Sequence, residues 1–373
     1  MIKSVGHVMG HRIGKIKICF VIHSLHTGGM ERVMSELAKQ FSMKENIELH
    51  LVLYGRSRTI FYDIPKNVTL HKPGWSFRDD MRLIFTLRTL IWLRRTVSSI
   101  KPDTILSLGE YWNSFVLLAL KGKDVPIYVS DRCRPDLDLG QPHEWLRKWL
   151  YPNASGIISQ TQKAKDIYTK KFNHPNIRVI PNPIHEVKQI EKSVKKEDII
   201  LSVGRLIETK HHDRLIRIFD RVKKDNWKLV IVGGDAIQQN CMKQLKELIY
   251  ERDLKDRVEL TGNVSDVEKY YLKSKIFAFT SSSEGYPNVI GEAMSAGLPV
   301  IAYDCVAGPS EMVEDTITGY LVDTFDDQRF TDRLSELMES EILRNKMGEK
   351  AKTKIQKLSE NQIADQFFSF ILP

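Results

Sequence analysis

The sequence has few cysteines and no long apolar run. Its four cysteines are far apart in a chain of 373 residues, and none has a paired spacing: Cys19, Cys133, Cys241 and Cys305. This pattern argues against a disulfide framework or a zinc site and is typical of a reducing cytoplasm. No window approaches 18 uninterrupted apolar residues, so we expect no membrane-spanning helix. The first apolar run, residues 16–25, contains Lys17 and precedes glycines, which favours a strand over a signal peptide.

Two classes of ligand have little support. The sequence has no zinc-finger spacing and no aromatic-basic strand motif, so we expect no nucleic-acid partner. Gly28 and Gly29 follow the first expected strand, but they lack the third spaced glycine of a dinucleotide fingerprint. They favour close approach of the backbone to a phosphate, with a simple tight turn as the alternative.

The charge is unevenly divided between the two halves of the chain. Residues 1–186 hold 28 Lys and Arg against 16 Asp and Glu, whereas residues 187–373 hold 28 against 31. The net charges of +12 and −3 sum to the formal +9 of the whole chain. A basic first half indicates an anionic partner, and a membrane surface fits better than nucleic acid.

Short apolar runs alternate with helical patterns along the chain. Because strand–helix alternation is typical of parallel sheets with right-handed crossovers, we expect an α/β fold. The alternation restarts after Arg178–Pro183, where two prolines indicate a linker. The sequence therefore predicts two Rossmann-like, doubly wound domains that face each other across a cleft, with residues 1–183 and 184–356 as their bounds.

Two carboxylates flank an expected strand-to-helix loop in the second half. The run Ile276–Phe279 reads as a buried strand, and Pro287 is suited to the start of a helix. Glu284 then lies on the loop and Glu292 inside the helix. The first backbone amides of that helix would be unpaired and would favour an anion. A sugar nucleotide, which has a diphosphate between two polyols, fits this pattern; the alternative is a surface helix with two solvated glutamates. The expected donor-binding segment comprises Gly285, Tyr286, Pro287, Asn288 and Val289.

Two cations follow another expected strand, residues 199–204. Arg205 and Lys210 lie on the loop at its carboxyl end, which is where open α/β sheets bind ligands. Together they would neutralise a diphosphate leaving group without a metal ion. The alternative is a charged surface loop.

Several polar residues of the first half follow its expected strands. Glu110, Tyr111 and Asn113 follow the strand 104–108. They would line the side of the cleft where an acceptor molecule binds. Asp131 and Arg132 end the strand 127–130, where Asp131 would orient an acceptor hydroxyl or pair with Arg132. The short pattern Asp136-Leu137-Asp138 resembles a metal-binding motif, but its Pro- and Arg-rich loop argues against that role.

Taken in order, these motifs resemble those of the retaining glycosyltransferases of family 4, which have the GT-B architecture, and in particular bacterial surface-polysaccharide enzymes. The resemblance rests on His26–Val33, Arg205 with Lys210, Leu260–Asn263, and Glu284 with Glu292. It implies that Glu284 binds donor-sugar hydroxyls, Glu292 the ribose, and Gly262 and Asn263 the base of a UDP-linked donor. It also implies attack from the face that the diphosphate leaves, no cofactor, no catalytic metal, and a last helix near 357–373 that returns to the first domain. Arg132 stands where many members have a histidine.

Basic-aromatic segments indicate contact with an anionic membrane. They are residues 81–101 and 142–151, and the alternative for them is a helix packed on the sheet with its arginines at the surface. We therefore expect a peripheral enzyme at the inner face of the cell membrane that extends a glycan on a polyprenyl diphosphate. The rival functions are a UDP-sugar 2-epimerase of the same architecture and a non-catalytic nucleotide-sugar or membrane-binding module.

Overall fold

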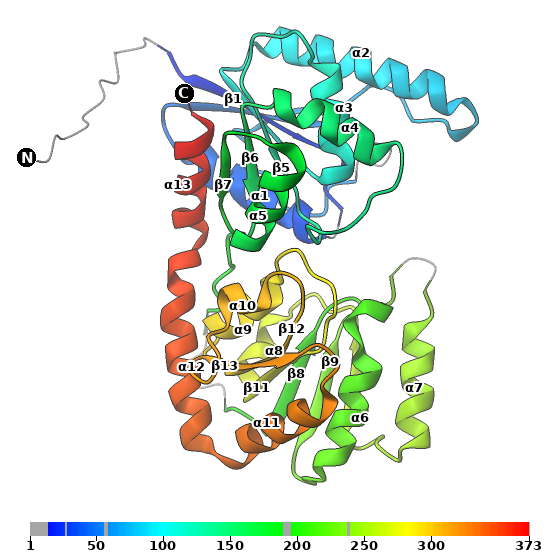
Figure 1. The fold of residues 1–373 in the computed structure, drawn as a ribbon, viewed down its shortest axis with the longest axis vertical. Helices are drawn as coiled ribbons and strands as arrows, with labels where there is room; N and C mark the ends of the chain where they lie inside the picture. Colours follow the sequence, from blue (N-terminus) through cyan, green and yellow to red (C-terminus); the bar gives the residue numbers. More distant parts are fainter. Residues whose placement is uncertain (1–13, 27, 56–58, 189–194, 237–238, 373) are drawn as a thin grey trace, which may run out of the picture.

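The computed structural model describes residues 14–372, except 27, 56–58, 189–194 and 237–238. Two α/β units lie one above the other, each built around its own parallel sheet (Figure 1). The expected fold of two Rossmann-like domains is therefore confirmed. None of the helices in the described ranges combines the length and apolar character that crossing a bilayer requires.

The first sheet has the strand order β3-β2-β1-β4-β5-β6-β7. The chain runs outward from β1 to β3, then crosses back to β4 and continues in the opposite direction. This reversal places the loops after β1 and β4 beside each other at a topological switch point. The strands are β1 Ile16–Ile22, β2 Ile47–Leu53, β3 Thr69–His71, β4 Thr104–Leu108, β5 Ile127–Ser130, β6 Gly156–Ser159 and β7 Ile177–Val179.

The second sheet has the order β10-β9-β8-β11-β12-β13 and reverses in the same way between β8 and β11. The loop carrying Arg205 and Lys210 therefore lies next to the loop carrying Glu284. The strands are β8 Ile199–Val203, β9 Lys228–Val232, β10 Val258–Gly262, β11 Ile276–Phe279, β12 Val300–Asp304 and β13 Gly319–Asp323.

Helices cover both faces of each sheet, as parallel crossovers require. Those of the first unit are α1 Gly29–Ser42, α2 Arg82–Ile100, α3 Glu110–Ala119, α4 His143–Leu150 and α5 Gln162–Phe172. Those that follow are α6 His212–Val222, α7 Cys241–Glu251, α8 Glu268–Lys273, α9 Asn288–Ser295, α10 Pro309–Met312, α11 Asp327–Glu339, α12 Glu341–Ile355 and α13 Glu360–Ile371.

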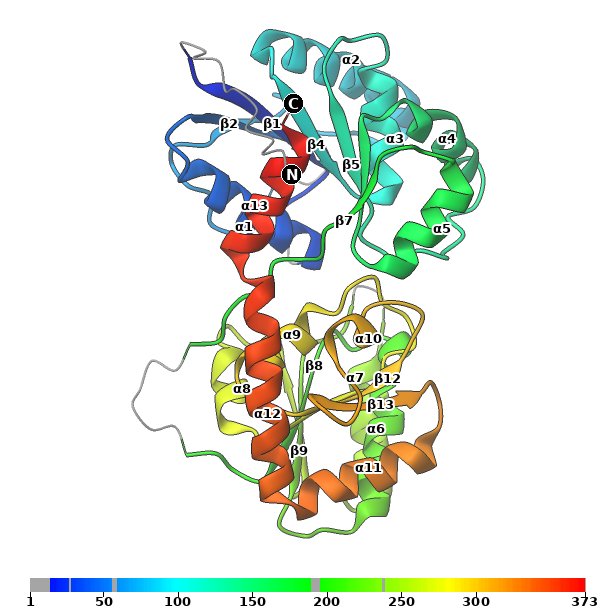
Figure 2. The ribbon, with the colours of Figure 1, turned by 60° about the vertical axis from the view of Figure 1, so that its left-hand side comes forward.

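The last helix belongs to the core of the first unit. Figure 2 shows α12 beside the second unit and α13 continuing upward alongside α1. Ile363, Phe367 and Ile371 are fully buried in one cluster with Ile18 and Phe20 of β1. The chain thus crosses between the units twice, once after β7 and once through α12 and α13.

Two edge strands differ from the sequence expectation. β3 was not expected, and β7 occupies part of the segment interpreted as a linker. Each has three residues and pairs on one side only, so neither leaves a readable alternation in the sequence. Helix α3 begins at Glu110, which places Glu110 inside its first turn.

Candidate active site

The loops after β8 and β11 meet at the switch point of the second sheet. Lys210 Nζ donates to Glu284 Oε1 at 2.6 Å, and both side chains are largely shielded from solvent. The loop backbones are joined as well, because Thr280 Oγ1 donates to the Lys210 carbonyl at 2.9 Å. Two residues separated by 74 positions, both singled out from the sequence, therefore form one ion pair.

Glycines bring neighbouring strand ends of this sheet close together. A Cβ on Gly233 would lie 1.9 Å from the Gly204 carbonyl oxygen, so a larger residue would force the loop before Arg205 away. Gly233 N donates to the carbonyl of Gly262 at 3.1 Å. Asn263 follows with an exposed side chain, and Arg205 is also exposed. The residues expected to contact phosphate and base therefore lie at the ends of β8 and β10, on either side of β9.

Helix α9 begins directly after Pro287, as expected. The first backbone amides of a helix lack intrahelical partners, and Asn288 and Val289 supply them here. Tyr286 and Pro287 are buried, so their side chains are not presented to a ligand. A Cβ on Gly285 would lie 2.4 Å from the Arg132 carbonyl oxygen, which makes glycine necessary for contact with the first domain.

Glu292 is buried and already has two partners. Arg32 of α1 donates to its Oε1 at 2.6 Å, and the Tyr271 hydroxyl donates to its Oε2 at 3.0 Å. Burial of Arg32 opposes its charge, but Glu292 and other neighbours raise the pKa of Arg32 above its usual value. The sequence analysis assigned no role to Arg32, although Arg32 lies within the motif His26–Val33.

Gly28 and Gly29 lie where α1 begins, so Arg32 is in its first turn. Tyr62 holds the loop, since its hydroxyl donates to the Gly28 carbonyl at 3.0 Å. A Cβ on Gly28 would lie 2.3 Å from Glu31 Oε2, whereas a Cβ on Gly29 would meet open space. A larger residue at position 28 would therefore require only that the Glu31 side chain move.

Asp131 and Asn113 do not present their side chains to an acceptor, contrary to expectation. Asp131 accepts hydrogen bonds from Arg147, from the Tyr151 hydroxyl at 2.6 Å and from Asn113 Nδ2 at 3.0 Å. Asp131, Asn113 and Arg147 are all buried. A buried carboxylate requires compensation, and Arg147 rather than Arg132 provides it. The buried hydrogen bonds of these residues fix the position of the loop after β5.

Glu110 also faces inward, because its Oε2 accepts the backbone N–H groups of Arg132 at 2.9 Å and Cys133 at 3.3 Å. Tyr111 is 38% exposed and packs edge-on against His143. Of the expected acceptor-side residues on α3, only Tyr111 presents a side chain to solvent.

Arg132 lies at the contact between the two domains. Its guanidinium donates to Asn182 Oδ1, and Asn182 Nδ2 donates to Asn288 Oδ1 at 2.8 Å. Burial lowers the pKa of Arg132 to about 10. Arg132 is therefore connected through one amide to the first residue of α9.

The two carboxylates of the Asp136–Asp138 pattern each have a local partner. Asp136 pairs with Arg134 at 2.7 Å, and Asp138 accepts the Gly140 N–H at 2.8 Å.

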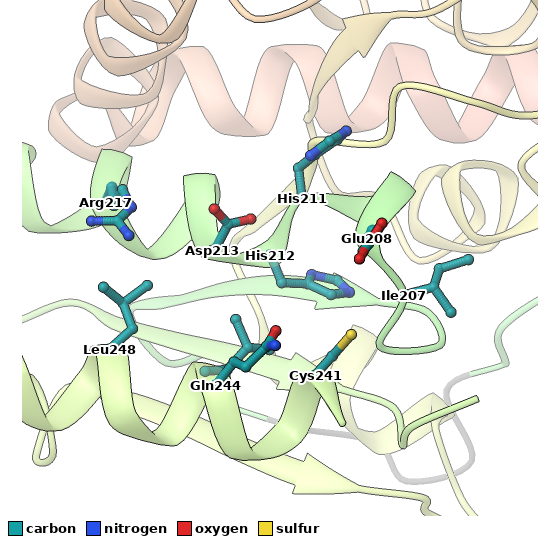
Figure 3. Close-up of a pocket in the computed structure, with 10 residues that line it drawn as sticks. Ile207, Glu208, His211, His212, Asp213, Arg217, Cys241, Gln244 and Leu248 are labelled. Carbon is teal, nitrogen blue, oxygen red and sulfur yellow. The ribbon is translucent and has the colours of Figure 1, made fainter. Parts of the chain in front are cut away.

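A cavity of about 390 Å³ lies between the beginnings of α6 and α7 (Figure 3). Glu208, His212 and Cys241 are among the residues that line it. Burial lowers the pKa of His212 to about 3, so this imidazole is neutral near pH 7. None of the expected donor-binding residues lines the cavity, although Glu208 lies between Arg205 and Lys210 in the chain.

Comparison with known families covers both halves of the chain. The profile described as "Glycosyltransferase Family 4" matches residues 27–187, and "Glycosyl transferases group 1" matches residues 183–354. The chain belongs to these GT-B glycosyltransferases. The resemblance inferred from the motifs is confirmed.

Relatives and solved structures agree over nearly the whole length. Amylovoran biosynthesis glycosyltransferase AmsD of Erwinia amylovora is 29% identical, with 87% of this chain and 91% of the relative covered. An N-acetylgalactosamine-N,N'-diacetylbacillosaminyl-diphospho-undecaprenol 4-alpha-N-acetylgalactosaminyltransferase of Campylobacter jejuni is 27% identical, with 95% and 99% covered. The structure of Anabaena HepE in complex with UDP has a TM-score of 0.80 at 18% identity, with 95% and 99% covered.

We predict that Asp131→Ala lowers the free energy of unfolding by about 3–5 kcal/mol, because it leaves Arg147 buried without its partner. Urea denaturation of the purified variant measures this. Asp138→Ala, an exposed change in the same loop, should have little effect. Unchanged stability with lost activity in Asp131→Ala would instead support a direct role of Asp131 with the acceptor.

Proposed function

We propose that this glycosyltransferase moves a hexose or N-acetylhexosamine from a UDP-linked donor to a hydroxyl of a lipid-linked glycan, with retention of anomeric configuration. The observation that carries the proposal is the convergence of Arg205, Lys210 and Glu284 at the switch point of the second sheet. We take residues 1–183, with the helix near 357–373, as the acceptor-binding domain and residues 184–356 as the donor-binding domain.

The charge of the leaving diphosphate is the main catalytic problem in this reaction. Arg205, Lys210 and the first amides of α9 would stabilise that charge as it develops. A bound diphosphate competes for Lys210, and the Glu284 carboxylate then becomes available to donor-sugar hydroxyls. The acceptor attacks from the side on which the diphosphate departs, and a phosphate oxygen takes the acceptor proton. This scheme uses no protein nucleophile and no catalytic metal.

Glu292 would bind the ribose while Gly262 and Asn263 contact the base. A carboxylate oxygen has two lone pairs, so Glu292 can accept a ribose hydroxyl beside the N–H of Arg32 or the hydroxyl of Tyr271. Arg32 then keeps the Glu292 carboxylate oriented. In this arrangement the first domain contributes to nucleotide binding through Arg32.

The relatives support the proposed substrates. The name of the Campylobacter relative includes a diphospho-undecaprenol acceptor, and AmsD is named for amylovoran biosynthesis. A lipopolysaccharide 1,6-galactosyltransferase of Escherichia coli is 24% identical over 88% of this chain. The structural neighbour HepE was determined with UDP. These names favour surface-polysaccharide assembly on a lipid carrier.

The first test is a reaction with a panel of UDP-sugars and a polyprenyl-diphosphate-linked glycan. We expect one donor to be consumed, with the new bond in the donor's anomeric configuration by NMR and with activity unaffected by EDTA. Arg205→Ala should lower kcat by roughly 10²–10³-fold, as loss of one preorganised donor does. A new free sugar from the donor alone would favour the epimerase, and binding without turnover the non-catalytic module.

Substitution of the two glutamates should affect the binding of different ligands. Glu292→Gln should weaken the binding of free UDP. Glu284→Gln should weaken the binding of the intact sugar nucleotide but not that of UDP. A hydrogen bond to a charged group contributes about 1.5–3 kcal/mol, so we expect a loss of about tenfold or more in each case by calorimetry. Equal weakening of UDP by both variants would contradict this division.

The surface of the first domain supports binding to an anionic membrane at the inner face of the cell membrane. α2, at the end of the molecule distant from the second unit in Figure 1, exposes apolar side chains at helical spacing. They are Leu83 (85% exposed), Ile84 (59%), Leu87 (59%) and Ile91 (42%). Exposed apolar residues in such a group are typical of an interaction surface.

Basic and aromatic residues of α4 extend this surface. Lys121 connects the two helices, because its carbonyl accepts from Arg94 at 2.9 Å and its Nζ lies 4.2 Å from the Trp149 ring centroid. Trp145 and Trp149 are exposed. Arg147 cannot contribute, contrary to expectation, because it is buried with Asp131, and Arg94 is engaged with carbonyl oxygens.

We predict that binding to anionic vesicles falls steeply with salt and is weak on neutral vesicles, since each exposed basic residue contributes about 1 kcal/mol. A variant with Arg82, Arg88, Arg95 and Lys148 changed to Gln should stay in the supernatant when vesicles are sedimented. Its UDP affinity should be unchanged, which controls for folding. Persistent sedimentation of this variant, or none for the wild type, would contradict the membrane proposal.

A further inference from the structure

Four ionisable side chains from four elements meet where the two domains join. His185, in the segment after β7, contacts Glu360 of α13 through Nδ1 at 3.0 Å and Glu268 of α8 through Nε2 at 2.9 Å. Glu36 of α1 completes the group. Ligand atoms of Glu36, His185 and Glu360 all lie within 4.8 Å of one another. Among the described residues, no other group of three such side chains converges this closely.

Glu36 and Glu360 need a positive species between them. Glu36 Oε2 is fully shielded from solvent and has no hydrogen-bond partner among the residues that the structure describes. Two carboxylates that approach each other out of water repel unless a proton or a metal cation lies between them.

We propose that Glu36, His185 and Glu360 bind a divalent transition-metal ion, with His185 coordinating through Nδ1. Both nitrogens of the imidazole lie at hydrogen-bond distance from a carboxylate, and coordination of an ion would use one of them. When Nδ1 binds the ion, the opposite N–H donates to the Glu268 carboxylate, and such a carboxylate partner typically orients a metal-binding histidine. The site is separate from the residues assigned to sugar transfer, and the proposal does not depend on that function.

The ligand types indicate which ions fit. One imidazole nitrogen with two carboxylates suits Zn²⁺ or Mn²⁺, whereas Mg²⁺ and Ca²⁺ prefer sites made of oxygen alone. Water would complete the coordination. Glu36 also lines a cavity of about 510 Å³ with Tyr62 and Lys66.

The bound ion would join both domains. Glu36 and Glu360 lie on helices of the first unit, and His185 and Glu268 belong to the linker and the second unit. Glu36 is also one helical turn after Arg32, whose guanidinium contacts Glu292. The ion would thus add a second contact between α1 and the second unit, beside the one that Arg32 already makes with Glu292.

The test uses full-length protein treated with EDTA and then titrated with ZnCl₂, MnCl₂ or MgCl₂ in separate calorimetric experiments. We expect one equivalent of Zn²⁺ to bind, a rise in Tm with Zn²⁺, and no such response to Mg²⁺. Glu36→Gln and His185→Gln should each lose this equivalent. Glu268→Gln should weaken it by about 10–100-fold, as loss of a partner behind a metal-binding histidine does.

The matched control is His50→Gln, because His50 also contacts a glutamate and a second histidine, Glu48 and His71, at 3.0 Å. This variant should keep the Zn²⁺ equivalent, and circular dichroism would show that every variant is folded. Absence of Zn²⁺ binding to wild type, or equal binding by folded Glu36→Gln, would overturn the proposal and assign the cluster to a shared proton. The two proposals are tested separately. If activity survives EDTA, the assignment of sugar transfer stands whether or not Zn²⁺ binds to this cluster.

Discussion

Every pairing between the named strands of both sheets is parallel, and the position of the site follows from this constraint. A parallel strand can be followed only by a crossover, so each loop that leaves a carboxyl end lies at the same edge of its sheet. Where the strand order reverses, adjacent loops diverge to opposite faces and leave room for a ligand. The β8–β11 reversal brings Lys210 and Glu284 together in this way.

The donor-binding domain depends on the first domain for the charge balance of Glu292. This carboxylate is buried, and a buried charge without a partner is strongly destabilising. Arg32 provides the compensating charge from a helix 260 residues earlier in the chain. The link from Arg132 through Asn182 to Asn288 adds a second polar contact near the same helix. Orientation of the Glu292 carboxylate is therefore coupled to the arrangement of the two domains.

Local patterns in the sequence predicted which residues lie at the strand ends, but not their partners. Lys210 and Glu284 each follow an apolar run, so their positions could be inferred separately. Asp131 could also be placed at the end of β5, yet nothing near it in the sequence indicated that Arg147 would turn inward to meet it. The basic-aromatic composition of 142–151 suggested a surface, and burial of Arg147 shows that composition alone does not separate a solvated arginine from a buried one.

The ion pair of Lys210 and Glu284 explains how the site can hold charges suited to a ligand. Isolated, either group would be costly in a partly buried position, and paired they neutralise each other. The Thr280–Lys210 hydrogen bond fixes the two loops relative to each other, so a bound diphosphate meets a cation that is already in place. An anion that takes Lys210 leaves Glu284 as an acceptor for neutral hydroxyls, which a sugar next to that diphosphate provides. In the proposed reaction, one pair would therefore serve both parts of a sugar nucleotide, and electrostatic preorganisation of this kind needs little rearrangement during transfer.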